Sequence, residues 1–226
     1  MEELLKALIP NVMTKVPELV KSLWQTLYMM GLSGAISFVL GLIFGIILTV
    51  TKKRGIMENV VVYNILDKII NTFRSIPFII LLAALIPLTR AVVGTAIGTK
   101  GAILPLVFGT VPFFTRQIET ALAELDSGLI EASQAMGSSP MEIIYRVYLK
   151  ESIPSIVRVT TITFISLVGL TAMAGAVGGG GLGDFAIRYG HQRNQVDVTY
   201  VTVIILLIVV NLIQGLGNFI IRKTTH

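Results

Sequence analysis

Five stretches without a single charged residue dominate this sequence of 226 residues and restrict the folds that it can adopt. In chain order they cover residues 22–51, 75–89, 101–115, 159–183 and 198–221. A helix needs about 20 apolar residues to cross a hydrocarbon layer of about 30 Å. The first, fourth and fifth stretches are long enough by themselves, whereas the second and third need residues from their flanks.

The composition agrees with a chain that resides in a lipid bilayer. Hydrophobic residues make up 54% of the sequence and charged residues only 14%, and the mean hydropathy is +0.81. These values lie far from the balance of a soluble domain. We therefore predict an all-α integral membrane protein, a single transmembrane domain over residues 1–226. Its spans, about five in number, are expected near residues 22–51, 72–92, 99–122, 156–180 and 198–221.

Prolines interrupt the two shorter stretches, at Pro77 and Pro87 in the second and at Pro105 and Pro112 in the third. A proline in a membrane helix leaves a backbone carbonyl without its usual hydrogen bond, and lipid cannot supply one. We therefore expect both segments inside a helix bundle or beside a water-filled path.

The basic residues predict the orientation of the chain in the membrane. The net charge is +5, but Lys and Arg gather at the ends of the apolar stretches, which favours a role in topology over nucleic-acid binding. The groups expected in the cytoplasm are Lys52, Lys53 and Arg54, then Arg146 and Lys150, and finally Arg222 and Lys223. Five spans then place the N-terminus outside and the C-terminus in the cytoplasm. Four basic residues on the opposite side oppose this orientation: Arg90, Lys100, Arg188 and Arg193.

A polar insert, at about residues 124–153, separates the third stretch from the fourth. It reads as a short helix with Asp126 or Ser127 as its N-cap and Gly137 as its stop. Ser139 then caps a second helix, with proline at the first helical position and Glu142 completing a capping box. The insert is too short to cross a membrane, so we expect it on the cytoplasmic side.

The insert resembles the E-A-A-x-x-x-G loop of the permease subunits of ABC importers. Glu131, Ala132 and Gly137 match that spacing, Ser133 stands where the family has a second alanine, and Lys150 replaces a proline further along. Two other stretches resemble the methionine branch of these permeases: RSIPFIILLAALIPLTR at 74–90 and AVGGGGLGDFAIRYGHQR at 176–193. The resemblance implies that Glu131, Ala132, Ser133 and Gly137 form a coupling helix that docks on an ATPase.

The same resemblance implies the partners and the location. It predicts a homodimer in the bacterial inner membrane, two cytoplasmic ABC ATPase subunits that bind the ATP, and an extracytoplasmic substrate-binding protein. The substrate would be methionine or a closely related small amino acid. Taken singly, Glu131 also suits a helix start because of the macrodipole, and Gly137 also suits a plain C-cap.

The residues themselves restrict the mechanism. No G-x-x-x-x-G-K-[ST] sequence occurs, so ATP hydrolysis is not expected on this chain. The charge-free cores lack the ionisable residues of a proton relay and of a membrane-embedded active site. We expect no catalytic, cofactor or metal residues here. A gradient-driven carrier or channel remains the alternative, and a membrane enzyme ranks a distant third.

Overall fold

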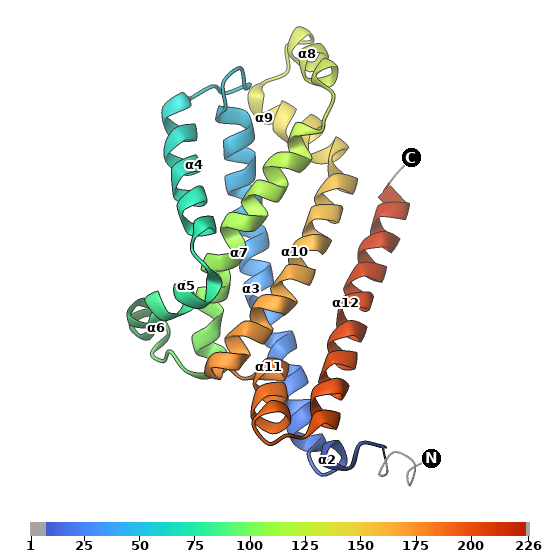
Figure 1. The fold of residues 1–226 in the computed structure, drawn as a ribbon. Helices are drawn as coiled ribbons and strands as arrows, with labels where there is room; N and C mark the ends of the chain where they lie inside the picture. Colours follow the sequence, from blue (N-terminus) through green and yellow to red (C-terminus); the bar gives the residue numbers. More distant parts are fainter. Residues whose placement is uncertain (1–7, 225–226) are drawn as a thin grey trace. The chain divides into compact units, whose positions relative to one another are not determined.

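The computed structural model describes residues 8–224, which form a succession of helices with no strand among them (Figure 1). The first seven are α2 (Pro10–Met13), α3 (Val16–Thr51), α4 (Val60–Ser75), α5 (Phe78–Ala84), α6 (Ile86–Val93), α7 (Gly98–Ala123) and α8 (Ser127–Ala135). There follow α9 (Pro140–Ile143), the π-helical η1 (Ile144–Leu149), α10 (Ile153–Ala174), the π-helical η2 (Gly175–Gly179), α11 (Gly181–Phe185), the π-helical η3 (Ala186–His191) and α12 (Val196–Thr224). The prediction of an all-α chain is confirmed for these residues.

Four helical segments of the described chain are long and apolar enough to cross a membrane: Val16–Thr51, Gly98–Ala123, Ile153–Gly179 and Val196–Thr224. They contain or nearly coincide with four of the five expected spans. The expected span at 72–92 is not one helix. The chain is extended at Ile76, with ψ of 123° before Pro77, and α6 begins with a proline in its first turn. Because proline disfavours a helical residue before it, α4 ends before Pro77. A second break, at Leu85, separates α5 from α6, and a total of five spans stays a prediction.

The helices gather into two compact units, and α3, α7, α10 and α12 each contribute to both. One unit comprises residues 8–35, 77–108 and 164–213. Its core includes Met29, Leu106 and Leu167, all fully buried. The predicted single domain over 1–226 remains a prediction.

A glycine run in this first unit is held by side chains of α3. Gly178, Gly180 and Gly181 have φ values of 95°, 78° and 78°, which glycine adopts without the steric cost that other residues bear. The N–H of Gly181 donates to Oε1 of Gln25 at 2.9 Å, and the N–H of Leu182 donates to Oγ1 of a threonine, Thr26, at 2.8 Å. The start of α11 is thereby fastened to the early turns of α3.

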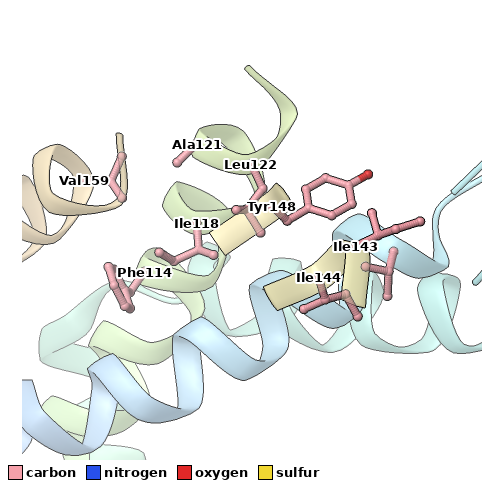
Figure 2. Packing of buried hydrophobic residues seen from close by; sticks show 9 residues of the cluster. Phe114, Ile118, Ala121, Leu122, Ile143, Ile144, Tyr148 and Val159 are labelled. Carbon is pink, nitrogen blue, oxygen red and sulfur yellow. The ribbon is translucent and has the colours of Figure 1, made fainter. Parts of the chain in front are cut away.

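The second unit comprises residues 36–76, 109–163 and 214–224. Its core joins α7 to the insert, and Figure 2 shows most of the members of this cluster. The buried side chains are Val50, Phe114, Ile118, Ala121, Leu122, Ile143, Ile144, Tyr148 and Val159. Since three of them belong to α9 and η1, the second helix of the insert packs an apolar face on the core of its unit.

In this second unit α3 and α7 approach each other closely at two glycines. A Cβ built on Gly41 would lie 2.5 Å from Phe114, and one on Gly45 would lie 2.5 Å from Ile118. The two contacts are four residues apart on both helices, so α3 and α7 run parallel and in register. Small residues that let two backbones meet are typical of helix packing in membranes.

Candidate functional site

The polar insert forms two short helices joined by a glycine bend, at the end of the second unit where α3 ends and α4 begins (Figure 1). Asp126 is the N-cap of α8, and its carboxylate accepts a hydrogen bond from the N–H of Gly128 at 2.9 Å. This settles the choice between Asp126 and Ser127 in favour of the aspartate. The cap satisfies one of the free amides with which any helix begins.

Gly137 ends α8 in a Schellman motif. Its φ is 81°, its N–H donates to the carbonyl of Gln134 at 2.9 Å, and the N–H of Ser138 donates to the carbonyl of Ser133 at 3.1 Å. These two bonds satisfy carbonyls that the helix end would otherwise leave free. The predicted stop at Gly137 is therefore confirmed as a structural feature.

The predicted capping box after the bend is present. Ser139 Oγ accepts from the N–H of Glu142 at 3.4 Å, and the Glu142 carboxylate accepts from both the backbone N–H and the hydroxyl of Ser139 at 2.9 Å. The hydrogen bonds from Ser139 hold the pKa of Glu142 below its ordinary value. Lys150, where the resembled family has proline, keeps helical angles (φ −69°, ψ −47°), and α10 begins shortly after it at Ile153.

Burial separates the predicted docking residues into two groups. Glu131 and Ala132 are exposed, and Gly137 is exposed at the bend. Ser133 is 8% exposed and lies on the opposite side of α8 from Glu131, toward the rest of its unit. The exposed surface of α8 therefore includes Glu131 and Ala132, while Ser133 helps to seat the helix on its unit.

Four apolar side chains of the insert extend this surface, and the residue pattern alone did not single them out. Their exposed fractions are 46% for Leu129, 78% for Met136, 53% for Met141 and 64% for Tyr145. A cluster of exposed apolar residues among polar ones is typical of a protein interaction site. The signal in the sequence was the occurrence of these apolar residues among the polar ones of the insert.

Burial raises the pKa of Tyr148, which packs in the core of the second unit. Among residues 8–224, no three His, Asp or Glu side chains gather in a way that could hold a metal ion. A short capped helix with a mixed apolar and acidic outer face can dock into a groove and transmit a push.

Known proteins resemble this chain over nearly its whole length. Residues 37–225 match the family described as binding-protein-dependent transport system inner membrane component. The Vibrio cholerae protein named "Probable D-methionine transport system permease protein MetI" is 48% identical over 208 residues, covering 92% of each chain. The Escherichia coli K12 "D-methionine transport system permease protein MetI" is 50% identical over 139 residues, which cover 62% of this chain and 64% of that protein.

Solved structures agree with the sequence relatives. A chain of the inward-facing "MetNI methionine ABC transporter" superposes with a TM-score of 0.92 at 46% identity, covering 94% of this chain and 99% of that one. A chain from an amino acid ABC transporter with histidines shares the fold, with a TM-score of 0.78 at 16% identity. The family match spans the insert, the glycine run and most of the membrane helices. The chain therefore belongs to the family of binding-protein-dependent transport system inner membrane components.

Proposed function

We propose that this chain is the membrane-spanning permease subunit of an ATP-driven ABC importer for methionine or a closely related small amino acid. The observation that carries the proposal is the capped helix α8, exposed at the end of its unit and followed by the Gly137 bend. The names of the relatives in Vibrio cholerae and Escherichia coli, and of the similar solved transporter, support the substrate and the ATP-driven mechanism.

Two copies of the chain would form the translocation path in the bacterial inner membrane. Each copy would dock one of two cytoplasmic ABC ATPase subunits, and a substrate-binding protein would deliver methionine from outside. ATP would bind to the ATPase subunits, with no cofactor on this chain. The lipid bilayer surrounds the apolar helices. The N-terminus would lie outside and the C-terminus in the cytoplasm, because the basic groups after α3, in the insert and in the last turn of α12 then share the cytoplasmic side.

Coupling would follow from the way in which α8 is fastened. Glu131 and Ala132, together with exposed Leu129 and Met136, would contact the ATPase. The adjoining α9 and η1 are anchored in the core that contains α7, through Ile143 and the two other buried residues of these helices. When the ATPase subunits close on ATP, the motion of α8 would be passed to α7, and the path would switch between two states that ligands populate differently.

Transport of labelled methionine tests the proposal. Cells that lack the chain, and the same cells complemented with it, would be assayed for uptake of L- and D-methionine under ATP depletion and, separately, with an ionophore. We expect the chain to restore uptake that only ATP depletion abolishes. Restored uptake that the ionophore alone abolishes would identify a gradient-driven carrier instead. No restored uptake of either enantiomer would remove methionine as the substrate.

A pair of matched variants tests the docking surface directly. Met136→Glu places a charge at a residue that is 78% exposed on the insert, and Ile97→Glu does so at a residue that is 74% exposed in the first unit. We expect Met136→Glu to reduce co-purification of the ATPase, while Ile97→Glu leaves it unchanged. Equal co-purification of the ATPase by both variants would remove the insert as the docking site.

A further inference from the structure

Helix α4 carries three different faces, and one of them is polar and exposed. At 100° per residue, its inward face comprises Tyr63, Leu66, Ile70 and Phe73, of which Ile70 is buried and the others are half-buried. A second face is mainly apolar and exposed, with Val61, Ile65 and Ile69 at 68%, 57% and 50% exposure, and Thr72 as its one exposed polar residue. The third, which we call the polar stripe, comprises Asn64, Lys68, Asn71 and Ser75, all exposed.

The contacts of α4 show that it lies lengthwise along two membrane helices. The N–H of Asn59, its N-cap, donates to the carbonyl of Thr51 at the end of α3. Eight residues later Asp67 forms an ion pair with Arg116 of α7. Because α3 and α7 run in register, Arg116 is level with Ile43, which comes eight residues before Thr51. Helix α4 therefore runs antiparallel to α3, side by side with it (Figure 1).

This register places the polar stripe at membrane depth. Asn64 is level with Ile46 and Asn71 with Val39, both inside the charge-free run at 22–51, and Ser75, the last residue of α4, comes about one turn further along. At 1.5 Å per residue, the stripe extends over about 16 Å. It covers one half of the bilayer and ends where the helix breaks before Pro77.

Contact between the polar stripe and the hydrocarbon of the bilayer is energetically unfavourable. Lys68 is exposed and forms no ion pair among residues 8–224, and the same holds for Arg74 in the last turn of α4. Asp67, in contrast, forms an ion pair with Arg116, which also pairs with Glu119. Ionisable residues in membrane segments face a bundle interior or a water-filled cavity, because exposure to acyl chains is costly. The apolar face of the same helix meets lipid or protein without that cost.

We propose that the polar stripe of α4 forms a wall of the water-filled translocation path in the cytoplasmic half of the membrane, and that Lys68 binds the carboxylate of the passing substrate there. The proposal rests on the proposed function for the direction of transport and for a substrate that has a carboxylate. Lys68 gives this stripe a positive charge, because Asp67 lies outside the stripe and forms its ion pair with Arg116, which also pairs with Glu119. An ammonium group amid amide and hydroxyl groups is complementary to a hydrated carboxylate.

Cysteine scanning in the assembled complex tests the wall, and the chain contains no cysteine that would interfere. Single variants Asn64→Cys, Asn71→Cys and Ser75→Cys report on the stripe, with Val61→Cys, Ile65→Cys and Ile69→Cys as controls on the apolar face of the same helix. A charged methanethiosulfonate reagent would be added to inverted membrane vesicles. We expect stripe cysteines to react at least about tenfold faster than controls, because a charged reagent does not enter hydrocarbon.

Three results would overturn the proposal that the polar stripe lines the translocation path. Slow reaction on both faces would show that the stripe is covered, and equal rapid reaction on both faces would show that α4 is not at the border of lipid and water. Disulfide formation between stripe cysteines of two copies, with no reaction toward the reagent, would make the stripe a contact between copies. Uptake and ATPase co-purification by the unreacted variants test the proposed function separately, so failure of one proposal is distinguishable from failure of the other.

The role of Lys68 has its own test. Lys68→Ala should raise the KM for methionine uptake about tenfold, because a hydrogen bond to a charged group is lost, whereas Lys68→Arg should retain a KM within about twofold. ATPase co-purification should be unchanged in both variants. An unchanged KM in Lys68→Ala would overturn the carboxylate contact, and an equal rise in Lys68→Arg would do the same.

Discussion

Substitutions at Gly137 can distinguish the effect of backbone strain on ATPase binding from the effect of side-chain contact. Its φ of 81° lies in the left-handed region, and a Cβ added there would meet no atom within 4 Å. The cost of Gly137→Ala is therefore one of backbone conformation, about 1–2 kcal/mol. That is a factor of about 5–30 in the population of the bend. Asparagine tolerates the left-handed region better than alanine does, so Gly137→Asn is a matched control with a larger side chain.

We expect the wild-type permease to bind the ATPase most tightly, followed by Gly137→Asn and then Gly137→Ala, with the β-branched Gly137→Val binding most weakly. The assay is titration of purified ATPase onto the permease in detergent, with ATP-driven methionine uptake measured in parallel. The melting temperature of the permease should change little, because the core of its unit contains no atom of Gly137. Equal affinity for alanine and glycine would refute the role of the bend. Weaker binding by asparagine than by alanine would show that side-chain size decides the affinity.

Three further predictions concern stability in detergent. Gly45→Ala should lower the free energy of unfolding by about 1–3 kcal/mol through overpacking. Gly31→Ala is the control, because no atom lies within 4 Å of its new Cβ, and it should lower that free energy by nothing. Equal melting temperatures for the two variants would contradict the close approach of α3 and α7 at Gly45. Thr26→Val leaves the N–H of Leu182 without its acceptor and should cost about 1–3 kcal/mol, with faster hydrogen exchange at that amide as the specific readout. Glu142→Gln should lower the melting temperature at pH 7. Because the folded-state pKa of Glu142 is lowered, this stabilisation is present above its ordinary pKa of 4.5 and is lost as pH falls through the lowered value. A difference between wild type and Glu142→Gln that stays constant down to pH 3 would contradict the capping box.

Local patterns in the sequence predicted local structure well. The capping box at Ser139 and the stop at Gly137 involve residues within a few positions of each other, so their hydrogen bonds follow from sequence spacing. The long charge-free runs predicted α3, α7, α10 and α12 because burial in lipid leaves little alternative to a helix. The break at Ile76 was signalled by Pro77, but the second span was assigned by extending a short apolar run into its flanks, across that break.

Contacts between distant residues could not be predicted in this way. Gln25 and Thr26 bind amides 156 positions further along the chain, and nothing in their immediate sequence identifies those partners. The burial of Ser133 likewise depends on the surface on which α8 rests. The polar stripe was hidden for a different reason. Its residues lie in the segment between two apolar runs, and only the pairing of Asp67 with Arg116 places that segment alongside membrane helices.

The close approaches at glycine differ in what stands opposite, and this has an evolutionary consequence. The nearest atoms opposite Gly41 and Gly45 belong to the side chains of Phe114 and Ile118, which a second substitution could shorten, and a Cβ on Gly45 would also lie 3.1 Å from the carbonyl of Thr115. We expect these pairs to covary among relatives, with a larger residue on α3 accompanied by a smaller one on α7. Opposite Gly183 stands the backbone of Ala172. No replacement of a side chain can relieve a clash with a backbone carbonyl, so Gly183 is expected to remain glycine among relatives. Gly41 and Gly45 are instead expected to vary together with Phe114 and Ile118.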